Sequence, residues 1–162
     1  MSPPPDGPLS QWITELVGKA PAFDKVMGLA ANDFFIPVAM ALILLGLWFG
    51  TKSQARWRDS YQWWIMIASS GLGVACLIVY LFNTYIGSWP RPFEVYQSAS
   101  LAVDSLHYRS HAPSFPCNSA AFEFAMAMGI WFRNRKFGAI LFALAILMSF
   151  ARFYVGAHYL SD

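Results

Sequence analysis

Two long runs without a charged residue constrain the fold most, because each is long enough to approach or complete a membrane crossing. Residues 34–50 and 61–82 contain no Asp, Glu, Lys or Arg, and about 20 apolar helical residues cross the hydrocarbon core of a bilayer. Further apolar runs at 120–132 and 137–154 predict two more spans. Only 12% of the 162 residues are charged, whereas soluble domains carry about 25%. We therefore expect an all-α, polytopic transmembrane helical bundle of about four spans.

The N-terminal segment is expected to precede the spans without crossing the membrane. Residues 1–9 are rich in proline and predict a flexible N-terminus. Residues 10–19 have an amphipathic pattern with Trp12 on the apolar side, which favours an interfacial helix. Residues 10–162 would form a single transmembrane domain, because this length permits one core.

Basic residues between the runs predict how the chain is oriented. They occur in two connections: Lys52, Arg56 and Arg58 in the first, and Arg133, Arg135 and Lys136 in the second. Basic loops stay on the cytoplasmic side, and the two spans between these loops return the chain to that side. By alternation, residues 83–118 and the residues after Arg152 lie on the extracytoplasmic side. The net charge of +2 in such clusters indicates topology, and we expect no nucleic-acid partner.

Polar residues adjoin the spans in three short segments on the extracytoplasmic side. The last segment contains Arg152, His158 and Asp162. A His and an Asp four residues apart share one face of a helix or turn, so Asp162 can orient the His158 ring and leave its other nitrogen as a nucleophile. Arg152 and His158 converge only if the helix ends or kinks between them, which Gly156 permits.

The other two segments supply candidate phosphate ligands. Arg91 lies in the first, and Arg152 would join it, because the planar guanidinium group makes bidentate bonds to phosphate. In the middle segment, Asn118 or Ser119 is expected to be the N-cap of the third span. The free backbone N–H groups of that helix end would favour an anion.

At these segments the sequence resembles the type 2 phosphatidic acid phosphatase family, membrane lipid phosphatases that include undecaprenyl diphosphate phosphatases. In the family's third signature Ser-Arg is followed after five residues by a His, and after three more residues by an Asp. It is matched by Arg152, His158 and Asp162, with Ala151 in the place of the Ser. This is the most specific of the three matches.

The first two signatures are matched less completely. In the first signature a Lys is followed, after six residues, by Arg-Pro. Arg91 matches its Arg, but Thr84 occupies the place of its Lys. The second, Pro-Ser-Gly-His, falls on residues 116–119, where only the Pro is kept and Ser119 replaces the His. The family also has a further span after the third signature, and this sequence stops at Asp162, so the final family helix is absent from it.

The resemblance implies a mechanism without a metal or other cofactor. His158 would attack phosphorus to form a phosphohistidine, Asp162 would orient it, and Arg91 and Arg152 would bind the phosphoryl oxygens. The His of the second signature protonates the leaving group, which Ser119 cannot do near neutral pH. General acid catalysis contributes about 10²- to 10⁴-fold in rate. The loss matters most for a phosphate monoester and less for a prenyl diphosphate, whose leaving group is a stable anion.

The expected ligand is therefore a membrane lipid phosphate or, preferably, a prenyl diphosphate. His107 or His111 could supply the proton instead of Ser119. The resemblance places the protein in the bacterial inner (plasma) membrane with the site on the extracytoplasmic side. The alternative is a non-catalytic subunit of this fold, structural or lipid-binding, in a larger membrane complex with other protein subunits. A channel or transporter has little support, because no inverted repeat is present.

Several residues also have simpler interpretations. Arg91 could anchor a loop at the headgroups, and His158 could be an interfacial histidine. For Glu123, an interhelical hydrogen bond is favoured over a role as a proton or metal group. Cys117 is expected to be a packed thiol, and His107 lacks the convergent ligands of a metal site.

Overall fold

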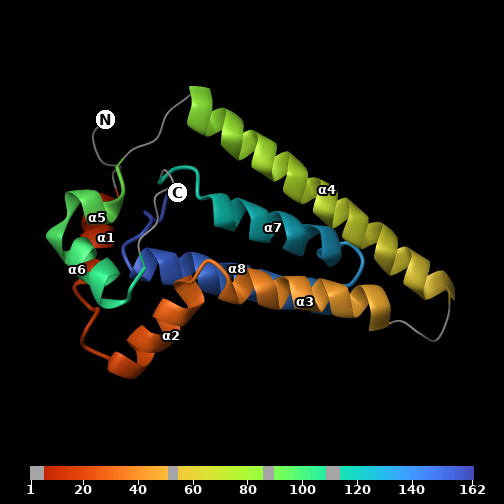
Figure 1. Ribbon diagram of the computed structural model, residues 1–162, viewed down its shortest axis with the longest axis horizontal. Coiled ribbons are helices and arrows are strands. Elements are labelled where there is room, and N and C mark those ends of the chain that lie inside the picture. Colours follow the sequence, from red (N-terminus) through yellow and green to blue (C-terminus); the bar gives the residue numbers. More distant parts are fainter. Residues whose placement is uncertain (1–5, 51–54, 86–89, 109–113) are drawn as a thin grey trace.

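The computed structural model is all-helical over the residues that it describes, 6–50, 55–85, 90–108 and 114–162. The helices are α1 (Gly7–Thr14), α2 (Pro21–Ala31), α3 (Phe35–Gly50), α4 (Ala55–Tyr85), α5 (Pro92–Val95), α6 (Gln97–Ser105), α7 (Asn118–Trp131) and α8 (Arg135–Tyr154). Figure 1 shows α3, α4, α7 and α8 along the long axis, with α1, α5 and α6 gathered at one end. The expected helical class is confirmed, whereas the helices at 21–31, 92–95 and 97–105 were not expected.

Small side chains allow the central helices to pack closely. Helix α7 contacts both α4 and α8, and a Cβ atom on Gly129 of α7 would lie 2.5 Å from the Cβ of Ala68 in α4. Small residues at such contacts are typical of helices that associate in membranes. The interior between the helices is filled by apolar side chains such as Met40, Leu141 and Met148, each at most 1% exposed.

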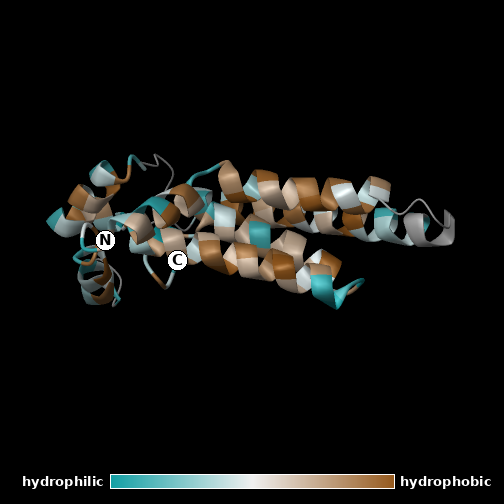
Figure 2. Ribbon diagram, turned by 90° about the horizontal axis from the view of Figure 1, so that it is seen from below, coloured by the Kyte–Doolittle hydropathy of each residue, from teal (hydrophilic) through white to brown (hydrophobic). Residues whose placement is uncertain are grey.

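The outer surface of the bundle is apolar. Large side chains on the long helices are more than half exposed, among them Leu42, Phe49, Trp63, Leu77 and Ile146. Figure 2 shows hydrophobic residues along the elongated part of the molecule and hydrophilic residues mainly toward its ends. A water-soluble protein would bury such side chains. The protein is therefore an integral membrane protein, as expected.

The helices differ in their capacity to cross a membrane. Among the described residues, 59–85 of α4 and 135–154 of α8 are each long and apolar enough, and α2 and α3 qualify only together, as a pair bent by 59°. Helix α7 has 14 residues, a length of about 21 Å, whereas the hydrocarbon core is about 30 Å thick. The bundle thus has two or three candidate spans where about four were expected, because α7 does not begin until Asn118 and ends before Arg133.

The bend between α2 and α3 places a carboxylate beside the end of α8. The Asn32 side chain accepts a hydrogen bond from the Phe34 backbone N–H at 2.9 Å, and such local bonds compete with helix continuation. Asp33 lies at this break, beside Arg152 of α8. The bend therefore connects the N-terminal helices to the end of α8.

The N-terminal helix differs from the expected one in its bounds and its buried face. Helix α1 begins at Gly7 and ends at Thr14, so it starts inside the segment expected to be flexible. It buries Ser10 and Ile13, while Trp12 is 57% exposed. Helix α1 turns its small and polar face toward α6 and α8, where the Thr14 hydroxyl donates to the Ser98 hydroxyl at 3.1 Å, so the exposed Trp12 remains on the outer side of the helix.

Helix α8 has defined signals at both ends. The Asn134 side chain accepts hydrogen bonds from the backbone N–H groups of Lys136 and Phe137, which makes it an N-cap. After Tyr154 the chain turns at Gly156, whose φ of +82° favours glycine. A Cβ atom there would also lie 2.8 Å from the Thr14 Cγ2 atom. The helix therefore ends between Arg152 and His158, as the sequence predicts.

Candidate active site

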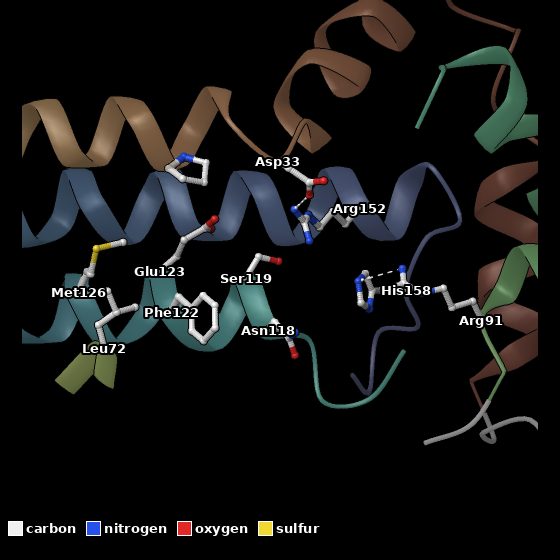
Figure 3. Close-up of a pocket in the computed structure, with 11 residues that line it drawn as sticks. Asp33, Leu72, Arg91, Asn118, Ser119, Phe122, Glu123, Met126, Arg152 and His158 are labelled. Carbon is white, nitrogen blue, oxygen red and sulfur yellow. Dashed lines mark hydrogen bonds and ion pairs between the residues drawn. The ribbon is translucent and has the colours of Figure 1, made fainter. Parts of the chain in front are cut away.

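A cavity of about 450 Å³ lies where α7, the end of α8 and the α2–α3 bend meet. Figure 3 shows the lining residues: Asp33, Pro37, Leu72, Arg91, Asn118, Ser119, Phe122, Glu123, Met126, Arg152 and His158. Five of the six predicted site residues are in this lining, and the sixth, Asp162, contacts His158. The structure thus brings together all six residues chosen from the sequence.

The contacts of His158 define the state of its ring. Its Nδ1 atom lies 3.0 Å from the Ser114 carbonyl oxygen and 3.1 Å from the Asp162 Oδ2 atom. Both partners are acceptors, so we assign the ring hydrogen to Nδ1. Its Nε2 atom lies 3.3 Å from the Arg91 Nη1 atom, which can only donate. The Nε2 atom therefore carries the lone pair.

Asp162 is itself held rigidly. Its Oδ2 atom accepts hydrogen bonds from the Ser114 hydroxyl at 2.5 Å and from the Tyr159 backbone N–H at 2.9 Å. Its side chain is 1% exposed. The imidazole orientation is thus fixed by two segments far apart in sequence. Sequence reasoning missed Ser114, although it lies two residues before Pro116 in the second signature segment.

Arg91 is buried beside the histidine. Its Nη1 atom donates to the Ala157 carbonyl oxygen at 2.9 Å, in addition to its contact with His158. The Arg91 Cζ atom lies 5.9 Å from the Phe93 ring centre. Burial lowers the pKa of Arg91 below its usual value, since a cation loses hydration there. A bound anion would compensate that loss.

Arg152 is fixed by a carboxylate that the sequence interpretation did not include. Its Nη2 atom donates to Asp33 Oδ1 at 2.5 Å, and Asp33 also accepts from the Tyr108 hydroxyl at 3.2 Å. The Arg152 Cζ atom lies 5.5 Å from the Tyr108 ring centre. Its buried Nε atom has no hydrogen-bond partner among the described residues. The Arg152 side chain lines the cavity, and its positive charge favours an anion there.

The start of α7 differs by one or two residues from the prediction. Cys117, rather than Asn118 or Ser119, is the N-cap residue, and α7 begins at Asn118 without a side-chain cap. The Cys117 backbone N–H instead donates to the Asp162 carbonyl oxygen at 3.2 Å. Asn118 and Ser119 are thus the first two residues of α7, and both line the cavity.

Cys117 is buried, as expected of a packed thiol, but its surroundings are polar. Burial would raise its pKa, yet hydrogen bonds with His158 and Ser119 prevail and lower the pKa of Cys117 to about 6. For His158, burial would lower the pKa, but the hydrogen bonds to Asp162 and Cys117 prevail and raise the pKa of the ring above its ordinary value. Cys117 therefore favours the protonated form of the histidine.

A Cys117→Ser substitution is expected to move the acid limb of any His158-dependent activity to lower pH. A neutral ring is needed for attack, so activity falls as the pH drops through the pKa of His158. That pKa is raised in part by Cys117, and a hydroxyl does not ionise in this range. The acid limb of kcat/KM plotted against pH would therefore shift to lower pH. The control is Cys76→Ser, the same change at an exposed cysteine. An acid limb that stays in place would contradict this role of Cys117.

Other residues singled out in the sequence lie outside this arrangement or differ from expectation. Neither carboxyl oxygen of Glu123 has a hydrogen-bond partner in the described part of the chain, so the expected interhelical hydrogen bond is wrong. Thr84 donates to the Tyr80 carbonyl oxygen within α4 and is not among the cavity residues. His107 is exposed and does not line the cavity, and His111 lies outside the described residues.

Comparisons with known proteins place the chain in a family. The model of the PAP2 superfamily matches residues 62–162. Undecaprenyl-diphosphatase BcrC of Bacillus subtilis (strain 168) is 32% identical over 126 residues, which cover 77% of this chain and 58% of the relative. The chain thus spans a little over half the length of that protein. No solved structure matches.

Proposed function

Because the chain belongs to the PAP2 superfamily, we propose that it hydrolyses a lipid phosphate or a prenyl diphosphate through a phosphohistidine on His158. The observation that carries this proposal is the state of the His158 ring. Its Nδ1–H is held by Asp162 and Ser114, and its Nε2 lone pair lies next to Arg91 in the cavity. A ring held at Nδ1, with the lone pair on Nε2, is the arrangement of an activated nucleophile.

The cavity can hold the transferred phosphoryl group close to that nitrogen. Arg91 lies beside the Nε2 atom, and the positively charged Arg152 side chain lines the same cavity. Phosphoryl transfer requires positioning and charge stabilisation more than covalent assistance. On binding, phosphoryl oxygens would take over the Arg91 donor now shared with His158 and leave the Nε2 atom to attack phosphorus.

The rest of the lining suits a lipid. In Figure 3 the basic residues lie at one end of the cavity, and Leu72 and Met126 lie at the other. A polar head and an apolar tail can therefore be bound at the same time. The relative's printed name, undecaprenyl-diphosphatase, describes a ligand of this kind, and we propose that a prenyl diphosphate is the preferred substrate.

We further propose that the site faces the extracytoplasmic side of the bacterial inner membrane. The turn between α7 and α8, which carries Arg133, lies at the end of the bundle opposite the cavity, next to Arg135 at the start of α8. The end of α3 and the start of α4 lie at the same end (Figure 1). Basic connections favour the cytoplasmic side. The cavity would then open on the opposite side.

The test is phosphate release by the purified protein in detergent. We expect release from a prenyl diphosphate and a slower or equal release from phosphatidic acid, both without added metal and in the presence of a chelator. Acid-labile phosphate should be trapped on the protein during turnover. Folded protein that releases phosphate from neither substrate would contradict the proposal.

The second candidate is a non-catalytic subunit of a larger membrane complex, and Ser119 favours it. A serine at the place of the general acid removes one chemical group from the site. This alternative predicts binding of lipid phosphates without turnover, together with a partner protein that copurifies in a fixed ratio. Turnover in the assay above would exclude it.

A further inference from the structure

The site described above lacks an assigned proton donor for the leaving group. Ser119 lines the cavity, but a serine hydroxyl does not act as an acid near neutral pH. Asp33, another acidic residue in the lining, is paired with Arg152, and His158 serves as the nucleophile. Among the described lining residues, this leaves Glu123 as the acidic group without a role.

Glu123 is buried and has no polar contact to explain its burial. Its side chain is 1% exposed, and both carboxyl oxygens are without hydrogen-bond partners in the part of the chain that the structure describes. Burying a carboxylate without a partner is costly, whereas a neutral carboxyl group is tolerated more readily. The surroundings thus favour the form that carries a proton.

The position of Glu123 suits a leaving group. It lies four residues after Ser119 on α7, so both side chains are on the same face of that helix. Figure 3 shows it between the basic end of the cavity and Met126 at the apolar end. A lipid whose phosphate is bound by Arg152 and whose chain runs toward Met126 must place its bridging oxygen between these two ends.

We infer that the carboxyl group of Glu123 is the general acid that protonates the leaving oxygen, an inference that rests on the phosphatase function proposed above. The His158 Nε2 lone pair forms the N–P bond, and the P–O bond to the leaving group breaks. The electron pair of that bond goes to the leaving oxygen, which takes the proton of Glu123. In the second step the Glu123 carboxylate removes a proton from water, whose oxygen displaces His158 from phosphorus. This releases inorganic phosphate and restores both residues.

This assignment widens the substrate class. The alcohol of a lipid phosphate monoester leaves as a strongly basic alkoxide and requires a proton, whereas a prenyl phosphate or a nitrophenolate leaves as a stable anion. If Ser119 were the group at this position and no acid were present, the protein would hydrolyse only substrates with good leaving groups. With Glu123 as the acid, lipid phosphate monoesters are substrates as well.

The experiment compares leaving groups in a Glu123→Gln variant. Phosphate release is measured from phosphatidic acid, from a prenyl diphosphate and from 4-nitrophenyl phosphate. We expect a loss of about 10²-fold or more in kcat on phosphatidic acid and of less than about 10-fold on 4-nitrophenyl phosphate. The matched control is Glu15→Gln, the same change at an exposed residue of the N-terminal region. It should keep the wild-type activity on both phosphatidic acid and 4-nitrophenyl phosphate. Retained inhibition by orthovanadate shows that the variant's phosphate site is folded.

The outcomes separate this inference from the proposed function. A wild type that is silent on all three substrates refutes the phosphatase function itself. An active wild type with equal losses on both monoesters in Glu123→Gln refutes the general acid while the function stands. Wild-type turnover of the prenyl diphosphate without any of phosphatidic acid also refutes it.

Discussion

A His158→Ala substitution is expected to abolish phosphate release, with kcat at least about 10³-fold lower on every substrate, since no covalent intermediate can form without the nucleophile. The loss should not depend on the leaving group, because the N–P bond is absent whichever oxygen departs. His158 lies in a turn outside the helices, so thermal stability in detergent should change much less than activity. Phosphate release from a prenyl diphosphate and trapping of acid-labile protein phosphate are the measurements.

The matched control is His107→Asn. His107 is exposed and has a positive φ of 53°, a conformation that asparagine tolerates better than alanine. This variant should keep the wild-type rate. Equal phosphate release by His158→Ala and wild type would contradict the assignment of the nucleophile.

The sequence predicted the helical class and the convergence of Arg152, His158 and Asp162, because both depend on strong local signals. Uncharged runs mark helices that face lipid, and the spacing of Arg152, His158 and Asp162 needs only one turn at Gly156 to converge. The positive φ of Gly156 supplies that turn. Such information lies within about ten residues and needs no knowledge of the remaining chain.

Contacts between distant segments could not be predicted in the same way. Asp33 reaches Arg152 only because the chain breaks between α2 and α3, and Ser114 reaches Asp162 from a segment 48 residues away. The hydrogen bond expected for Glu123 was also wrong. Its position on α7 is local information, but the absence of polar partners for its oxygens among the described residues depends on the neighbouring helices. Each of these contacts depends on tertiary packing, which the hydrophobic periodicity of the sequence does not predict.

An Arg152→Ala substitution is expected to lower kcat/KM for phosphate release by about 10³-fold or more, the range seen when an arginine that stabilises a transferring phosphoryl group is removed. Asp33 already takes the Nη2 donor, so the unpartnered Nε–H and the positive charge are what the substrate would lose. Arg152→Lys should restore little, because one ammonium group cannot bind Asp33 and phosphate in the forked geometry of arginine. The measurement is kcat/KM on a prenyl diphosphate.

Asp33→Asn changes the same ion pair at its exposed partner. The Asp33 side chain is 54% exposed, whereas that of Arg152 is 7% exposed, and Asp33→Asn should cost only about 10-fold in rate through poorer placement of Arg152. Arg135→Ala, at the opposite end of α8 and stacked on Trp131, is the control and should retain activity. Wild-type kcat/KM in Arg152→Ala would mean that Arg91 and the N-terminus of α7 bind the phosphoryl group without Arg152. The Arg152–Asp33 pair would then only fix the α2–α3 bend against α8.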